Sequence, residues 1–368
     1  MTDNELFHLL ALVKIDGVGD IMAKKLITHC GSAEKVFQSK PSFLKNIDGV
    51  GKVLLQKLKN HSVLALAKSE MLYLKNKNIT CCSYLEESYP DRLKYCIDGP
   101  VLLFSFGTIN WNNRKIISIV GTRQVSAYGV DFCKKLIQDL APLNPIIVSG
   151  FAYGVDIVAH QAALDNNLQT VAVLAHGLNQ MYPKSHKKYV SKIEQNGGFI
   201  TEFWSTSSPE KENFVKRNRI VAGISEATIV IESAEKGGSL ITAILANDYN
   251  RDVFAVPGRT SDKFSQGCNN LIKTQQAHLL TSAADLIYIL NWEIQSNQEP
   301  QGIQKQLFVS LTEIEQKIYD YLLSKGKTEI DRIAIECDFP VFKMASFLIN
   351  MELKGLIRPL PGKLFEAI

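Results

Sequence analysis

Residues 146–160 contain an apolar strand that runs directly into a glycine turn and the start of a helix. Gly150 and Gly154 let the backbone approach a ligand closely, and the N–H groups that follow Gly154 have no partner within the helix. Such a strand–turn–helix unit is typical of α/β folds and can hold an anion at the helix N-terminus. Asp156 in the first turn could instead cap the helix, and its charge repels an anion unless a cation lies nearby.

The same alternation of strand and helix continues from about residue 79 to residue 292. It predicts a Rossmann-like α/β fold, in which a doubly wound and mostly parallel sheet has helices on both faces. The predicted strands are 116–120, 146–149, 170–174, 199–202, 228–231, 253–256 and 278–280. The predicted helices between them are 125–140, 154–165, 186–196, 217–224, 239–248 and 282–290.

An internal repeat marks the region before the sheet. Residues 15–26 recur as residues 47–58, and each copy places a Gly-Val-Gly turn before a short amphipathic helix. Each copy is similar to a helix-hairpin-helix module, whose hairpin offers backbone N–H groups to a DNA phosphate. Paired modules can also act only as helical packing units, so a DNA contact and a packing role both stay open.

The residues after the sheet form a further domain. Residues 293–306 are polar, rich in glutamine and broken by Pro300 and Gly302, which is the composition of a linker. Three helices (312–323, 328–336 and 340–353) and a two-stranded wing (355–365) follow, an order that resembles a winged helix. The third helix carries only Lys343 as a basic contact candidate, so a protein contact is expected there rather than duplex DNA.

The predicted domain organisation has four parts: a helical domain with two helix-hairpin-helix repeats (1–75), a Rossmann-like domain (76–294), a linker (295–306) and a winged-helix domain (307–368). The formal net charge of +4 means that any nucleic-acid binding depends on local clusters of Lys and Arg. The seven cysteines include no Cys-x-x-Cys pair, which argues against a disulfide framework and a structural zinc site. An acidic N-terminus and the lack of a long apolar run predict a cytoplasmic protein without a membrane segment.

Several loops follow predicted strands and fall at the carboxyl edge of the sheet, where open α/β sheets bind ligands. They are residues 120–123, 150–156, 182–188, 211–219 and 236–243. Basic residues cluster in two segments, 184–192 and 211–219, and the aromatic residues Phe151, Tyr182 and Phe214 lie among or near them. Aromatic rings beside cations suit single-stranded nucleic acid, because bases can stack while phosphates are neutralised.

Signs of catalysis are absent from the sequence. We find no Ser-His-Asp or Cys-His set, no paired-histidine metal spacing and no carboxylate pair placed for hydrolysis. His160 is expected to be a structural histidine. Glu202 and Glu232 could bind magnesium, although isolated carboxylates at strand ends more often cap turns. We therefore expect no catalytic residue, no metal and no cofactor.

Several motifs occur in a fixed order along the chain. They are Tyr89-Pro90, Gly99-Pro100-Val-Leu-Leu-Phe104, Val120-Gly-Thr-Arg123, Ser149-Gly-Phe-Ala-Tyr-Gly-Val-Asp156 with Ala159-His160, Tyr182-Pro183-Lys184, Phe214 with Arg217-Asn-Arg-Ile220, Gly238-Ser-Leu-Ile-Thr-Ala243 and Val256-Pro-Gly258. With these motifs the chain resembles the DNA processing protein A family (DprA/Smf). The resemblance implies a protein that binds single-stranded DNA without sequence preference, protects it and loads the RecA recombinase during natural transformation in competent bacteria. It also implies a homodimer formed through the Rossmann-like domain.

The resemblance also implies which residues form the site. Those matching the DNA-binding positions of the family are Arg123, Lys184, Lys211, Phe214, Arg217, Asn218 and Arg219. The residues expected to line the pocket are Gly121, Gly150, Phe151, Gly154, Asp156, Gly237, Gly238 and Ser239. Asp156 would then be a cap or the partner of a cation rather than a catalyst. Family members commonly have proline where this chain has Val215, so the segment after Phe214 is less restricted here.

The alternative interpretation of the sequence is an enzyme. The fold also resembles nucleotide phosphoribohydrolases of the lysine-decarboxylase-like group, whose Pro-Gly-Gly-x-Gly-Thr-x-x-Glu loop binds phosphate and supplies a glutamate. When Gly237-Gly238 is aligned with that loop, the later Gly-Thr pair becomes Leu240-Ile241 and the glutamate becomes Ile244. Because isoleucine can do no acid–base work, we expect binding without turnover.

Overall fold

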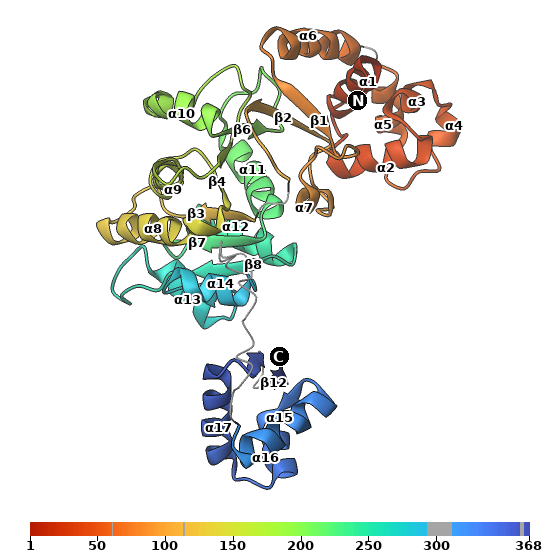
Figure 1. The fold of residues 1–368 in the computed structure, drawn as a ribbon. Coiled ribbons are helices and arrows are strands. Elements are labelled where there is room, and N and C mark those ends of the chain that lie inside the picture. The colour runs from red at the N-terminus through yellow and green to blue at the C-terminus, as the bar shows by residue number, and fades with distance from the viewer. Residues whose placement is uncertain (61, 113–114, 293–310, 361–363) are drawn as a thin grey trace. The chain divides into compact units, whose positions relative to one another are not determined.

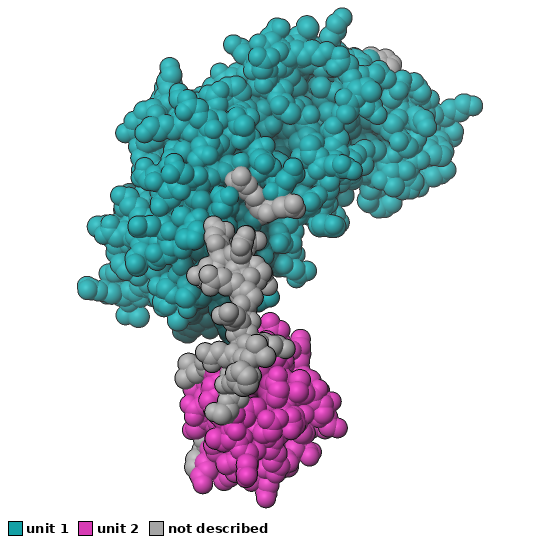
Figure 2. Space-filling view, viewed as in Figure 1, with its two compact units in different colours: residues 1–294 teal, residues 295–368 magenta. Residues whose placement is uncertain are grey.

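The computed structural model describes residues 1–60, 62–112, 115–292, 311–360 and 364–368. The chain forms two compact units, residues 1–294 and 295–368 (Figure 2). The predicted division at residue 75 falls inside the first unit, and the predicted linker 295–306 lies outside the described residues. Within the described parts of the chain, no helix has the length and apolar character needed to cross a membrane.

The first unit begins with helices that contain the repeat. They are α1 (Asp3–Val13), α2 (Asp20–Cys30), α3 (Ala33–Gln38), α4 (Pro41–Leu44), α5 (Lys52–Leu58) and α6 (Ser62–Asn76). The Gly-Val-Gly turns precede α2 and α5, and Gly17 and Gly49 have φ values of 91° and 89°, which side chains rarely adopt. The helices share one apolar cluster with Val101, Leu102 and Phe104, so this helical region packs directly on the edge of the sheet (Figure 1).

The sheet of the first unit has nine strands in the described residues. They are β1 (Thr80–Ser83), β2 (Leu102–Gly107), β3 (Ile116–Val120), β4 (Ile146–Ser149), β5 (Thr170–Val173), β6 (Gly197–Thr201), β7 (Ala227–Val230), β8 (Asp252–Ala255) and β9 (His278–Leu279). Their order is β1-β2-β6-β5-β4-β3-β7-β8-β9; β3 to β9 form parallel pairs, whereas β1 and β2 are antiparallel additions at one edge. The seven predicted strands are confirmed, and the two edge strands were not predicted.

Helices cover both faces of this sheet, as predicted (Figure 1). They are α7 (Asp91–Lys94), α8 (Ala127–Leu140), a 3-10 helix (Ala141–Leu143), α9 (Val155–Asp165), a second 3-10 helix (Lys184–Tyr189), α10 (Val190–Gln195), α11 (Lys211–Ile224), α12 (Gly238–Asp248), α13 (Gln266–Lys273) and α14 (Ala283–Ile289). β3 shows how the layers form: Ile116 and Val120 pack with α11, α12 and α13, whereas Ile117 and Ile119 pack with α8, α9 and α14. The doubly wound fold is therefore confirmed.

The second unit contains α15 (Glu313–Lys325), β10 (Thr328–Glu329), α16 (Ile330–Cys337), α17 (Val341–Leu353), β11 (Ile357–Leu360) and β12 (Leu364–Ala367). Its three helices and antiparallel wing strands agree with the predicted winged helix. The two-residue strand β10, which pairs with β12, replaces the predicted start of the second helix. A core that includes Ile318, Leu322 and Met344 holds the unit together.

Candidate functional site

A cavity of about 710 Å³ opens at the carboxyl edge of the sheet, beside the ends of β3 and β7. From β3, the next strands in sequence lie on one side (β4, β5, β6), whereas β7, β8 and β9 lie on the other. Open α/β sheets bind ligands where the strand order reverses in this way, because two loops diverge there and leave a crevice. Segments after β3, β4 and β7, together with α11 and α12, supply the lining.

Most of the predicted site residues meet at this cavity. Those that line it are Gly121, Arg123, Gly150, Asp156, Lys211, Phe214, Arg217, Asn218, Gly237, Gly238 and Ser239. Phe151, Gly154, Lys184 and Arg219 do not. Lining residues that the sequence reasoning missed include Thr122, Gln124 and Ser233. Each is adjacent in sequence to a residue named in the sequence analysis. Extending the candidates named there by one residue on either side would therefore have included them.

We expected residues 211–219 to lie in a loop and the next helix to begin only at residue 217. This expectation is wrong. α11 begins at Lys211, with Glu210 as its N-cap residue. Val215 keeps the backbone N–H that a proline would lack, so the helix can form through this position. The helical period then brings Lys211, Phe214 and Asn218 to the cavity, at spacings of three and four residues.

Two exposed cations and an aromatic ring form the rim of the cavity. The guanidinium carbon of Arg123 lies 5.4 Å from the centre of the Phe214 ring, a cation–π contact. The Tyr182 ring meets Phe214 edge to face at 5.9 Å, which connects the segment after β5 to the same rim. Arg123 and Lys211 are exposed, and neither forms an ion pair within the described residues. Their charges are therefore available to an anionic ligand.

A buried pair of opposite charges forms the floor of the cavity. Arg217 and Asp156 are only 6% and 7% exposed. Arg217 donates through Nη1 to the carbonyl of Val173, and Asp156 accepts from the N–H of Ala152 at 3.2 Å. Burial raises the pKa of Asp156 and lowers the pKa of Arg217, and in both cases the opposite charge acts against the shift. This arrangement supports the role of Asp156 as partner of a cation.

Gly150 leaves the space that this pair occupies. A Cβ atom at this position would lie 2.3 Å from Oδ2 of Asp156 and 2.4 Å from Nη1 of Arg217. Because real Cβ atoms do not approach polar atoms so closely, a side chain here would displace both charged groups. Gly150 therefore serves the close packing of the cavity floor.

The glycine turn before α9 is not the open anion seat that its sequence suggests. The N–H of Val155 donates to the carbonyl of Thr122 at 3.1 Å, so one of the first N–H groups of α9 already has a partner. The N-terminus of α12 is open instead: it lines the cavity, and the N–H groups of Gly238 and Ser239 have no hydrogen-bond partner in the described chain. An anion in the cavity can accept from them.

Two other candidates lie away from the cavity. Phe151 is 3% exposed, and its ring packs edge to face on His186 and Phe199. It cannot stack on a base, so the idea of a stacking surface at Phe151 is wrong. Lys184 is exposed at the start of the 3-10 helix 184–189, in the segment that also carries Tyr182.

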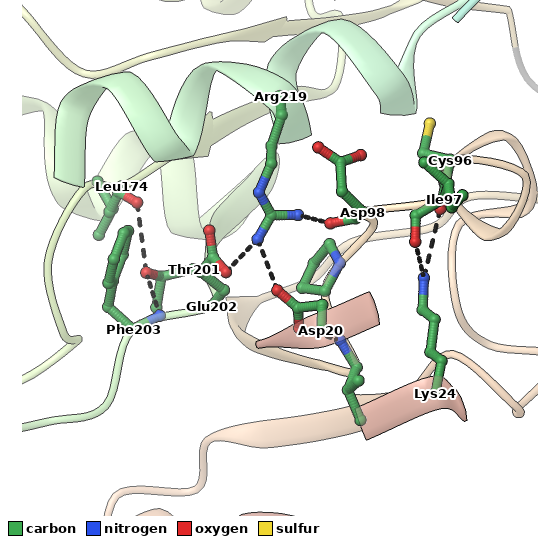
Figure 3. A network of polar contacts seen from close by, with 12 residues as sticks. Asp20, Lys24, Cys96, Ile97, Asp98, Leu174, Thr201, Glu202, Phe203 and Arg219 are labelled. Atoms are coloured by element: carbon green, nitrogen blue, oxygen red, sulfur yellow. Dashed lines mark hydrogen bonds and ion pairs between the residues drawn. The ribbon is translucent and has the colours of Figure 1, made fainter. Parts of the chain in front are cut away.

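Arg219 does not line the cavity and points to a different side of α11 from Arg217. Two residues along a helix are about 200° apart, so Arg217 and Arg219 cannot face the same ligand. The Arg219 guanidinium donates to Asp20, to Glu202 and to the carbonyl of Asp98 (Figure 3). All three acceptors belong to the protein, so the structure does not bring Arg219 to the candidate site.

The remaining polar candidates have structural roles. His160 is fully buried, and its Nε2 and Nδ1 lie 2.6 Å from the carbonyl oxygen of Gly150 and 2.7 Å from Oγ1 of Thr170. Glu232 holds Ser126, the N-cap residue of α8, since it accepts from the N–H of Ser126 at 2.8 Å and from its hydroxyl. Within the described residues, no group of three or more His, Cys, Asp or Glu side chains is arranged to hold a metal ion.

The burial of His160 predicts a pH-dependent stability. Burial lowers its pKa from 6.5 to about 4, so the unfolded chain binds a proton more readily than the folded chain between these values. Acidification from pH 7 to 5 should therefore cost about 2 kcal/mol through this residue, and the loss should be missing in His160→Gln. Urea unfolding at the two pH values measures the difference.

The control for this prediction is His29→Gln, which replaces an exposed histidine on α2. It should keep the pH dependence of the unmodified chain. An equal loss of stability on acidification in the His160→Gln variant would contradict the assignment of a neutral, buried imidazole.

Comparison with known proteins identifies the family. The family model described as DNA recombination-mediator protein A matches residues 80–291, and the model for the DprA winged helix domain matches residues 306–363. Protein Smf of Escherichia coli is 32% identical over 302 residues, which are 80% of this chain and 79% of Smf. DNA processing protein DprA of Streptococcus pneumoniae is 40% identical over 205 residues, 56% of this chain and 72% of that protein.

Solved structures agree with the sequence relatives. The X-ray structure of DNA processing protein A from Streptococcus pneumoniae matches with a TM-score of 0.64 and 32% identity, covering 78% of this chain and 98% of that one. The Helicobacter pylori protein, whose structure was reported for its single-stranded DNA binding mode, matches with a TM-score of 0.52 and 29% identity over 58% of this chain and 95% of that one. The resemblance seen in the motifs is thus confirmed, and the chain belongs to the DprA/Smf family of DNA recombination-mediator proteins.

Proposed function

We propose that this chain binds single-stranded DNA in the cavity beside β3 and β7, without preference for base sequence. The observation that carries the proposal is the pairing of the Arg123 guanidinium with the Phe214 ring at the rim, next to Lys211, a cation without an ion pair in the described residues. An unpaired nucleic acid strand needs both cations to neutralise its phosphates and an aromatic surface on which its bases stack. The single-stranded DNA binding reported for the Helicobacter pylori relative supports the same assignment.

The groups at the cavity divide into those for phosphates and those for bases. Arg123, Lys211 and the N–H groups of Gly238 and Ser239, which have no partner in the described chain, suit phosphate oxygens. The Phe214 ring offers a surface on which a base can stack. Stacking and phosphate contacts do not read the base edges, so binding should be tolerant of sequence.

The floor of the cavity supports binding rather than chemistry. Asp156 is the one carboxylate among the described lining residues, and it lies beneath Gly150 beside Arg217. A hydrolase of the alternative class needs a glutamate near the phosphate loop, where this chain has Ile244, which is half exposed on α12. We therefore propose a binding protein without a catalytic residue, metal or cofactor.

Membership of the family supports three further parts of the proposal. We propose that the bound strand is protected and passed to RecA during natural transformation, and that the chain forms a homodimer through its Rossmann-like domain. Lys184 remains a proposed contact for the strand outside the cavity, because it is an exposed cation in the segment that meets Phe214 through Tyr182.

Fluorescence anisotropy with labelled oligonucleotides tests the proposal. We expect the full chain to bind oligo-dT and mixed-sequence single strands with similar affinity, and to bind a duplex of the same length more weakly. The affinity should fall with salt, with a log–log slope of about −0.7 for each phosphate contact. Equal binding of duplex DNA, or no binding of single strands, would refute it, and release of free base from a nucleoside monophosphate would favour the hydrolase.

A further inference from the structure

The part of α11 that carries Arg219 lies outside the cavity lining and is held by a network of charged groups. Arg219 lies 3.0 Å from Oδ2 of Asp20, the first residue of α2, and also pairs with Glu202, which follows β6. Its Nη1 donates to the carbonyl of Asp98 (Figure 3). The side chains of Arg219, Asp20 and Glu202 are between 12% and 25% exposed, so solvent screens the two ion pairs only in part. One guanidinium thus connects the helical region, the sheet and α11.

The same network is anchored at several other points. Asp20 accepts from the N–H of Val101 at 2.8 Å through its second oxygen. Lys24, one turn further along α2, donates to the carbonyls of Cys96 and Ile97 at 3.3 and 3.4 Å. The start of α2 is therefore fixed to the segment before β2, and Arg219 fixes α11 to the same place.

The two copies of the hairpin repeat differ at this position. Asp20 is the residue directly after the first Gly-Val-Gly turn, and the equivalent residue of the second copy is Lys52, which is exposed. A helix-hairpin-helix that contacts DNA presents its turn and helix start to a phosphate. In the first copy, the helix start faces Arg219 of the same chain instead, so this hairpin has an internal partner.

Arg219 is shared between Glu202 and Asp20. Burial raises the pKa of Glu202 to about 7, although Arg219 acts against the shift. Glu202 and Asp20 both raise the pKa of Arg219 against the effect of its burial, so two carboxylates together hold the guanidinium. Oε1 of Glu202 is also buried without a hydrogen-bond partner in the described chain.

We propose that the N-terminal helical region positions α11 for DNA binding, with Asp20 acting as the positioning residue through Arg219. The inference rests on the proposed function of the cavity. Lys211, Phe214 and Asn218 reach the cavity only at one rotation of α11 about its axis. Arg219 fixes that rotation through contacts outside the cavity, about 12 Å further along the helix than Lys211.

Asp20→Asn gives the test, because positioning and bulk electrostatics predict effects of opposite sign. Loss of one negative charge should strengthen the binding of a polyanion if charge alone matters. Loss of the contact to Arg219 should instead weaken single-stranded DNA binding roughly tenfold. The salt slope should stay the same, since no phosphate contact is removed. Fluorescence anisotropy over a salt series measures both quantities.

The matched control is Asp16→Asn, which changes the charge equally in the same hairpin. Asp16 is exposed and pairs with Lys57, away from α11. This variant should bind as well as the unmodified chain or slightly better. If Asp20→Asn binds as tightly as Asp16→Asn, or if its salt slope falls by about 0.7 as for a lost contact, the proposal is overturned.

Two further measurements keep the test independent of folding and of the proposed function. In an Arg219→Gln background, Asp20→Asn should have little additional effect on affinity, because the two residues act through one contact. Amide hydrogen exchange over residues 215–222 should be faster in Asp20→Asn than in Asp16→Asn, even without DNA. If the unmodified chain fails to bind single strands, the proposed function fails, and the exchange rates still decide whether Asp20 holds α11. Unchanged exchange there would overturn the positioning role.

Discussion

Reversing the charges of Arg123 and Lys211 together is expected to weaken single-stranded DNA binding by roughly 100-fold at low salt. Each side chain is exposed at the rim of the cavity without an ion pair in the described residues. A hydrogen bond to a charged group contributes about 1.5–3 kcal/mol, so the loss of two such contacts gives at least this change. The log–log salt slope should become shallower by about 1.4, or about 0.7 for each phosphate contact. Fluorescence anisotropy with Arg123→Glu/Lys211→Glu measures both.

The control for this variant is Lys134→Glu/Lys135→Glu. It changes the net charge by the same amount at two exposed lysines on α8, neither of which lines the cavity. A small loss of affinity with an unchanged salt slope is expected, because only the general field of the protein is altered. If the two double variants lose affinity equally, the cavity is not the binding site.

The sheet was predictable because its central strands are buried on both faces. β3, β4 and β7 are short runs dominated by Ile, Val and Ala; a glycine directly follows β3 and β4, and Glu232 comes two residues after β7. β1 escaped prediction because Thr80–Ser83 is short, and two of its four residues are polar. β2 follows a Gly-Pro pair and has no following helix that would complete a strand–helix unit.

The site was predictable where it depends on topology and not where it depends on packing. Loops that follow parallel strands meet at one edge, so the segments that carry Gly121, Arg123 and Gly150 were expected there from their positions, and the family resemblance supplied their roles. Phe151 was wrongly expected at the ligand surface because its packing partner His186 lies 35 residues later, and no sequence pattern in either segment predicts the contact. Arg219 was misplaced because a basic run was treated as one patch. Once the run is helical, its members are divided between two faces.

The largest effect on stability is expected from Gly154→Ala, which should lower the free energy of unfolding by about 4 kcal/mol. Gly154 has φ 76° and ψ −128°, a conformation that side chains rarely adopt, and strain of this kind costs about 1–3 kcal/mol. A Cβ atom would also lie 2.2 Å from the carbonyl oxygen of Thr122. That oxygen belongs to the backbone and accepts from Val155, so it cannot move aside without breaking the contact between the turns after β3 and β4.

Gly238→Ala separates this effect from the general consequences of adding a methyl group to a glycine turn. Gly238 is the first residue of α12, and a Cβ there would meet nothing within 4 Å. Its stability should be unchanged or higher by about 0.5 kcal/mol, since alanine restricts the unfolded chain. Urea unfolding of both variants gives the comparison. Because Gly154 holds the turn that carries Arg123 against the turn that carries Asp156, equal stability of the two variants would mean that these turns are not locked together. The rigid cavity wall inferred from the Val155–Thr122 hydrogen bond would then be wrong.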